Sequence, residues 1–119
     1  MAETPKTSPK SLAIAEGEIV LALDCQALLA ADGPLPMPGV IHRDYSDLGA
    51  DLLARIAPTR VILPLFTTGH DAVAAIEALE RLGFGGLITV IGPDLPRPRL
   101  VERELRAAGP GQRLTLISP

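Results

Sequence analysis

Hydrophobic residues occur in five short runs separated by polar, glycine and proline residues. The runs span residues 19–23, 40–42, 61–66, 87–91 and 113–118. The first run is apolar without alternation and is closed by the polar Asp24, which is typical of a strand buried on both faces of a parallel sheet. The pattern therefore predicts five strands, most of which are built mainly from consecutive hydrophobic residues.

Between these runs, apolar residues recur every three or four positions, which predicts amphipathic helices. The stripes are Leu48, Leu52, Leu53 and Ile56; Val73, Ile76, Leu79 and Leu82; and Leu100, Val101, Leu105 and Ala108. Ser46 or Asp47 can cap the first of these helices, Asp71 the second, and Pro98 suits the first turn of the third. Gly83 and Gly109 are expected to end the last two.

Residues 26–31 also have a helical composition, but a proline-rich segment follows them. Residues 32–39 contain Pro34, Pro36 and Pro38, which exclude a regular helix or an interior strand there. The first helix is therefore expected to be short or absent. Because the sequence ends directly after the fifth strand, no final helix is expected either.

Alternating strands and helices joined by short links predict an α/β fold with right-handed crossovers. Five strands in this order favour a flavodoxin-like, doubly wound parallel sheet with strand order 2-1-3-4-5, whose binding sites lie at the carboxyl ends of the strands. Residues 1–16 are rich in Thr, Ser, Pro and Lys and are predicted to form a flexible tail. The α/β domain is predicted to span residues 17–119.

The composition narrows the classes of function. The chain has 119 residues, enough for one domain, and is 47% hydrophobic but only 3% aromatic, so Leu, Ile, Val and Ala must build the core. A net charge of −3 gives no general attraction to nucleic acid or to an anionic membrane. No apolar run is long enough to span a bilayer. The single cysteine, Cys25, and the lack of a signal-peptide pattern predict a cytoplasmic protein.

The segment from Val61 to Ala72 predicts a buried strand, a tight turn and a helix start. With residues 46–53, it resembles the third strand, and the second loop and helix, of response-regulator receiver domains, and the resemblance extends from about Glu18 to Pro119. Receivers hold Mg²⁺ with an acidic pair after strand one and accept a phosphoryl group on an aspartate in strand three. A Thr or Ser after strand four and a Lys-Pro after strand five detect the bound phosphoryl group.

Most of these functional groups are missing from the matching positions. The positions concerned are Asp24, Cys25, Pro64, Ile91 and Ser118. Asp24 stands where the first acid would be, but Cys25 follows it, and a hard ion such as Mg²⁺ gains little from a thiol. Pro64 replaces the phosphate acceptor. The resemblance therefore implies a pseudo-receiver that is not phosphorylated, needs no cofactor or metal, and regulates through protein–protein contacts in two-component signalling.

A second hypothesis is a module that binds a small ligand or nucleotide at the carboxyl ends of the strands. Its candidate residues are Asp24, Thr67, Thr68, His70 and Asp94. Capping of the next helix is the simpler interpretation of the two threonines, and an exposed loop position that of the histidine. A third hypothesis, catalysis by a Cys25–His70 pair, is disfavoured because the neighbouring Asp24 would raise the thiol pKa. We therefore expect no enzyme, and no zinc site from two histidines 28 residues apart.

The only concentration of basic residues lies near the last predicted helix. It comprises Arg97, Arg99, Arg103 and Arg106. Because Glu102 and Glu104 are interleaved, an ion-paired, solvated surface is the default interpretation. The alternative is a patch that binds an acidic partner or the phosphates of a nucleotide.

The expected loss of the first and last helices has a consequence for assembly. These helices normally cover one face of a doubly wound sheet, so their absence would leave that face open to water. We therefore predict a protein partner or a homodimer, with the exposed side of strands one, two and three as the contact.

Overall fold

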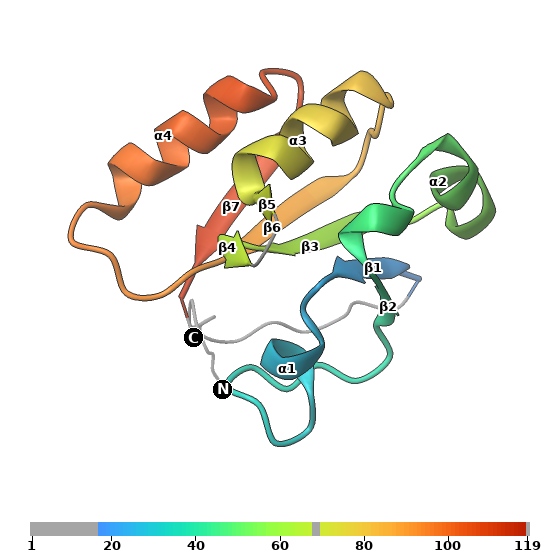
Figure 1. Ribbon diagram of the computed structural model, residues 1–119, viewed down its shortest axis with the longest axis horizontal. Helices are drawn as coiled ribbons and strands as arrows, with labels where there is room; N and C mark the ends of the chain where they lie inside the picture. Colours follow the sequence, from blue (N-terminus) through green and yellow to red (C-terminus); the bar gives the residue numbers. More distant parts are fainter. Residues whose placement is uncertain (1–16, 68–69, 119) are drawn as a thin grey trace, which may run out of the picture.

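The computed structural model describes residues 17–67 and 70–118 (Figure 1). The predicted tail, residues 1–16, lies outside the described residues. Five parallel strands form the main sheet, namely β1 (Val20–Leu23), β2 (Ile41–Arg43), β3 (Arg60–Pro64), β6 (Leu87–Ile91) and β7 (Arg113–Ile117). Their spatial order is β2-β1-β3-β6-β7, which confirms the predicted 2-1-3-4-5 winding.

The third predicted strand is divided in the structure. β3 ends at Pro64, and residues beyond it form a small antiparallel pair of β4 (Phe66–Thr67) and β5 (His70–Asp71). The predicted run 61–66 therefore covers two strands rather than one. This hairpin carries the chain from the carboxyl end of β3 to the start of the next helix.

The helices are α1 (Gln26–Leu29), α2 (Ala50–Ile56), α3 (Ala72–Arg81) and α4 (Pro98–Ala108), with a 3₁₀ turn η1 (Tyr45–Asp47) before α2. Asp71 caps α3 as predicted, its Oδ1 accepting from the Ala74 N–H at 3.0 Å. Gly83 follows α3 with a positive φ of 75°, also as predicted. The expected cap at Ser46 or Asp47 is wrong, because both residues belong to η1 and Gly49 precedes α2.

Both faces of the sheet are buried, and successive side chains of each strand point to opposite faces. On one face, Leu21, Leu63 and Val90 pack with Ile76 of α3 and Leu105 of α4. Figure 1 shows α3 and α4 side by side above this face and α1 on the opposite side of the sheet. The predicted stripes are only partly core-facing. Ile76, Leu79 and Leu105 are buried, and Val101 and Ala108 pack partly buried against the same cluster. The other members are exposed, namely Val73, Leu82 and Leu100.

The proline-rich segment covers the second face. Prolines 34, 36 and 38 are exposed, whereas Leu35 and Met37 between them are 4% and 3% exposed and pack with Val20, Ala22 and Ile62 of β1 and β3. An X-Pro sequence favours extended backbone, in which alternate side chains point to opposite sides. The proline–apolar alternation therefore places two apolar side chains on the sheet.

This cover is tied to the short first helix. The Leu35 N–H donates to the Leu28 carbonyl and the Met37 N–H to the Leu29 carbonyl, both at 3.0 Å. Gly33 lies against the same turn, where a Cβ would meet the Ala27 carbonyl oxygen. The expectation that one side of strands one to three is exposed is wrong for β1 and β3, because the short α1 and the proline-rich segment cover that side.

Candidate functional site

The carboxyl end of β1 is held by Asp24. Its backbone is left-handed, with φ of 57°, a conformation that aspartate tolerates better than most residues. Its N–H donates to the Arg43 carbonyl at 3.0 Å, and its Oδ1 accepts from the Tyr45 N–H at 3.3 Å. Asp24, which the resemblance predicts at the position of a receiver's first acid, therefore has a structural role in joining the ends of β1 and β2.

Cys25 follows Asp24 but does not face solvent. Cys25 is 1% exposed, and its thiol donates to the carbonyls of Leu23 at 3.3 Å and Ile62 at 3.7 Å. Burial, and to a lesser extent the charge of Asp24, raises the pKa of this thiol to about 12. A thiol that stays protonated and enclosed at neutral pH is a poor nucleophile and a poor metal ligand.

The positions that would carry the phosphate acceptor and the hydroxyl switch are packed closed. Pro64 and Ile91 are buried partners in the β3–β6 register. Beyond them, the Leu65 N–H donates to the Ile91 carbonyl at 2.8 Å, and a Cβ on Gly92 would lie 2.9 Å from Leu65 Cδ2. On this side, Leu65 thus packs on Gly92 directly after β3, and no carboxylate stands at the acceptor position.

Ser118 is the residue that the resemblance predicts at the position of a receiver's lysine. Its hydroxyl donates to the Pro93 carbonyl at 3.0 Å, so it fastens the chain after β7 to the loop that follows β6. The register places Pro64, Ile91 and Ile117 in one row across three strands. Pro64 and Ile91 therefore lie at one edge of the sheet with Ile117, the residue before Ser118, and Ser118 has a structural hydrogen bond.

The residues proposed for ligand binding are only partly described. Thr67 and His70 are opposite each other in the β4–β5 backbone register, and Asp94 is exposed in the loop before α4. Thr68 lies outside the described residues. Within residues 17–67 and 70–118, no group of three or more His, Cys, Asp or Glu side chains could hold a metal ion. In the same ranges, no helix is long and apolar enough to cross a membrane.

Arg99, Arg103 and Arg106 lie on the outward side of α4, three or four residues apart, and form what we call the α4 arginine strip. Arg106 donates to the Leu114 carbonyl at 3.0 Å and pairs with Glu102 at 3.5 Å. It therefore helps to hold α4 on β7. The other two arginines of the strip are exposed, as is Arg97 at the N-cap position of α4.

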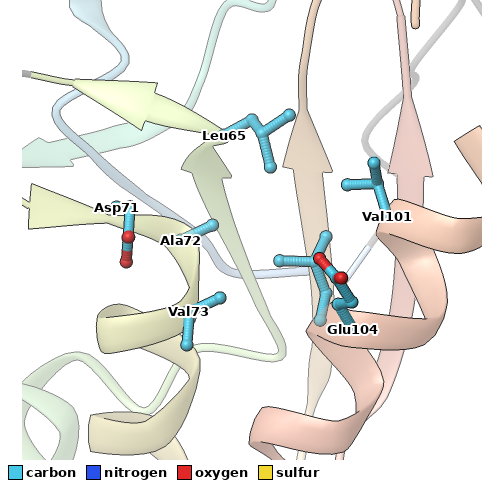
Figure 2. Close-up of a pocket in the computed structure, with 7 residues that line it drawn as sticks. Leu65, Asp71, Ala72, Val73, Val101 and Glu104 are labelled. Carbon is cyan, nitrogen blue, oxygen red and sulfur yellow. The ribbon is translucent and has the colours of Figure 1, made fainter. Parts of the chain in front are cut away.

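The structure also contains a pocket between the start of α3 and α4, which sequence analysis did not predict. Its volume is about 230 Å³. It is lined by Leu65, Asp71, Ala72, Val73, Val101, Glu104 and Leu105. Figure 2 shows Asp71 and Val73 on one side, Val101 and Glu104 on the other, and Leu65 reaching in from the end of β3. We call this the α3–α4 pocket.

The backbone explains why this pocket sits at the carboxyl edge. The Ala72 N–H donates to the Leu65 carbonyl at 3.2 Å, which closes the β4–β5 hairpin and sets the first turn of α3 beside the end of β3. One sequence signal could have indicated the pocket. The helical neighbours of Glu104 four residues away are Leu100 and Ala108, so this acid has no cationic partner on its own helix face.

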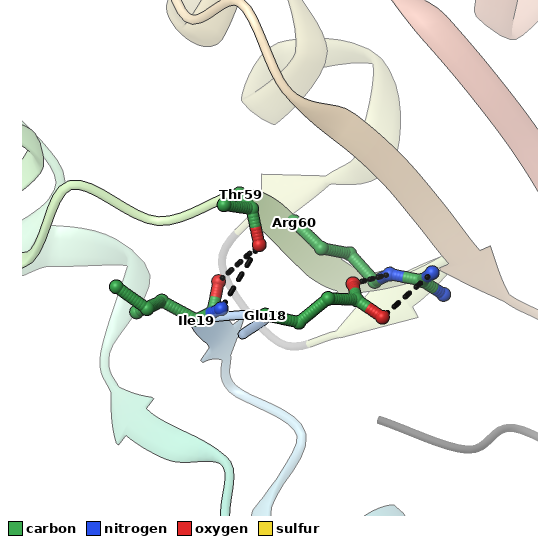
Figure 3. A network of polar contacts seen from close by, with 4 residues as sticks. All are labelled: Glu18, Ile19, Thr59 and Arg60. Atoms are coloured by element: carbon green, nitrogen blue, oxygen red, sulfur yellow. Dashed lines mark hydrogen bonds and ion pairs between the residues drawn. The ribbon is translucent and has the colours of Figure 1, made fainter. Parts of the chain in front are cut away.

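The opposite, amino-terminal edge of the sheet has a purely structural network (Figure 3). Arg60 Nε lies 3.0 Å from Glu18 Oε1, and its NH2 lies 3.5 Å from Oε2, with both side chains 17% exposed. Thr59 Oγ1 accepts from the Ile19 N–H at 2.9 Å and donates to the Ile19 carbonyl at 3.1 Å. These contacts hold the starts of β1 and β3 beside each other. The candidate functional residues lie at the opposite, carboxyl-terminal edge of the sheet.

The chain matches no protein-family model, no curated protein and no solved structure. Its fold class follows from the strand order and the helices described above.

Proposed function

We propose that this protein is a receiver-like regulatory module that is not phosphorylated and acts by binding other proteins. The observation that carries this proposal is the closed end of β3, where buried Pro64 occupies the acceptor position and Leu65 packs over Gly92. Aspartyl phosphorylation needs a carboxylate nucleophile and a divalent cation beside it. The first is replaced by a proline ring, and Cys25 fills the place of the second acid.

The described chemistry of the strand ends supports contact rather than catalysis. The thiol of Cys25 is buried and protonated, and Asp24 and Ser118 are engaged in backbone hydrogen bonds. Each residue in this set stabilises the connections between strands. A module built this way transmits a signal by changing what it binds, without a covalent step.

Incubation with acetyl phosphate and Mg²⁺ should leave the intact mass of the protein unchanged. The reason is that Pro64 has no oxygen to phosphorylate and that a lone Asp24 makes a weak Mg²⁺ site. Intact-protein mass spectrometry measures the result, with an authentic receiver domain treated in parallel as the positive control. A gain of one phosphoryl group on this chain would contradict the proposal.

We further propose that the α4 arginine strip is the contact with an acidic partner surface, which a second copy of the chain can supply. Arg99 and Arg103 are exposed and four residues apart, so both can meet one partner. The chain carries fourteen acidic residues against eleven basic ones, so acidic surface is plentiful on a second copy. Charge pairing at such a contact is salt-sensitive.

Sedimentation velocity at micromolar concentration and low salt should show a dimer. The double variant Arg99→Glu/Arg103→Glu should weaken its association about tenfold or more, because it places like charges opposite each other. Arg55→Glu, which reverses a charge on α2, is the matched control and should leave the dimer intact. A wild-type monomer at every concentration would contradict self-association, and a dimer unaffected by the double variant would contradict a contact through the α4 strip.

A further inference from the structure

The α3–α4 pocket combines an apolar floor with two carboxylates at its sides. Leu65 and Leu105 are 5% and 2% exposed, and Ala72 is 1% exposed, so the floor belongs to the hydrophobic core. Asp71 comes from the start of α3 and Glu104 from α4, and both residues are exposed (Figure 2). A group that enters this pocket meets hydrocarbon below and negative charge at the rim.

Asp71 and Glu104 differ in the hydrogen bonds and ion pairs that they already make within the chain. Asp71 Oδ1 accepts the Ala74 N–H at the helix cap. Glu104 has no hydrogen bond or ion pair within the part of the chain that the structure describes, in contrast to Glu102, which binds Arg106 and the Leu116 N–H. The residues three and four positions from it on α4 are apolar, namely Leu100, Val101, Ala107 and Ala108. The charge of Glu104 is therefore available to a cation from outside the chain.

The volume of the pocket favours a single side chain over a cofactor or drug-sized ligand as its occupant. At about 230 Å³, it is smaller than the roughly 300–1,000 Å³ typical of sites for cofactors and drug-sized ligands. A single side chain is the natural occupant of such a volume. Side chains that anchor protein interfaces are most often Trp, Tyr or Arg set in a pocket with apolar contacts around it.

Charge complementarity selects arginine from that group. A guanidinium presents several donors in a plane and a weakly hydrated surface that packs on hydrocarbon, so it can face two carboxylates while its stem lies on an apolar floor. Exposed apolar side chains lie in and near the pocket. Val73, which lines it, is 36% exposed, and Leu100, one helical turn before Glu104 and outside the lining, is 44% exposed.

We infer that the α3–α4 pocket is a docking site for a partner protein segment that inserts one arginine between Asp71 and Glu104 and places apolar side chains on Val73 and Leu100. This inference rests on the proposed function, because it names the chemistry of a protein partner. It is independent of the α4 arginine strip, which has the opposite charge.

A titration with the peptide acetyl-Gly-Leu-Arg-Leu-Gly-amide tests the docking site. Two-dimensional ¹H–¹⁵N spectra of the labelled protein should show shifts at the amides of Leu65, Ala72, Val101 and Leu105 at millimolar peptide. The same peptide with citrulline, the neutral isostere of arginine, should bind about tenfold more weakly, because the charged donor facing the two carboxylates is replaced by a neutral one.

Two protein variants should give the same loss. Glu104→Gln removes one charge, and Asp71→Asn removes the other while keeping a residue that caps helices as well as aspartate does. Each should weaken the arginine peptide about tenfold and leave the citrulline peptide unchanged. Asp32→Asn, in the loop on the other side of the sheet, removes an exposed charge from elsewhere and should bind the arginine peptide as the wild type does.

Equal affinity for the two peptides, shifts confined to other parts of the protein, or no shifts at millimolar arginine peptide would each overturn the docking site. These outcomes do not depend on phosphorylation. A phosphoryl group gained from acetyl phosphate would overturn the proposed function while leaving the peptide result intact, so the two failures are distinguishable.

Discussion

The thiol of Cys25 is expected to react with a disulfide reagent at least about a thousandfold more slowly in the native protein than in the unfolded chain. The attacking species is the thiolate, and raising the pKa from 9.0 to about 12 lowers its fraction by three factors of ten below pH 9. Burial of the sulfur at 1% residue exposure slows the reaction further. The native rate then reports opening of the structure around Cys25.

Absorbance of the released aromatic thiol at pH 8, with and without urea, measures this ratio. The chain has one cysteine, so the signal has a single source. The variant Leu35→Ala, which thins the cover over the cluster that contains Cys25, should raise the native rate. Labelling of the native protein at the unfolded rate would show an accessible thiolate and would return a nucleophilic cysteine to consideration.

The same pKa shift makes stability depend on pH in a fixed direction. Because the folded state holds the proton more tightly than the unfolded state, the contribution of Cys25 is complete below about pH 9 and is lost as pH rises from 9 towards 12. Between pH 8 and 10, the free energy of unfolding of the wild type should fall by about 1 kcal/mol more than that of Cys25→Ala. Urea unfolding followed by circular dichroism measures the difference, and parallel curves for the two proteins would contradict it.

The sequence was sufficient for the sheet because its main signal is strong and local. Continuous apolar runs such as Val20–Leu23 can be accommodated only where both faces of a strand are buried, and the alternation with helical stripes then determines the winding. Four helix ends were also predicted, at Asp71, Gly83, Pro98 and Gly109, because these residues act through local backbone chemistry. Local rules therefore account for most of the architecture.

The parts that were not predicted depend on contacts between distant segments. The proline-rich segment reads as a loop from its own residues, and only its position over β1 and β3 shows that Leu35 and Met37 are core residues. The α3–α4 pocket likewise requires the Ala72–Leu65 hydrogen bond that brings α3 to the end of β3. Alternation of proline with apolar residues is a sequence signal for such a cover, because it predicts extended backbone with one apolar side.

Leu35→Ala is expected to lower the free energy of unfolding by about 2–4 kcal/mol. Leu35 is 4% exposed and packs on the face of the sheet formed by Val20, Ala22 and Ile62, so the truncation removes buried methyl groups and leaves a cavity. Urea unfolding monitored by far-ultraviolet circular dichroism is the appropriate measurement, because the chain has no tryptophan and one tyrosine. Leu100→Ala, at a residue that is 44% exposed on α4, should change stability by less than about 0.5 kcal/mol.

The comparison of these two leucine variants decides whether the proline-rich segment is a structural layer or a surface loop. In a surface loop, Leu35→Ala would be as mild as Leu100→Ala, and Ile62 would face solvent on the side away from α3. An apolar strand face of that kind needs another protein to cover it, so a mild effect would restore the predicted contact through strands one to three. A loss of several kilocalories per mole would instead mean that the chain covers this face by itself, which directs the search for partners to α4 and the α3–α4 pocket.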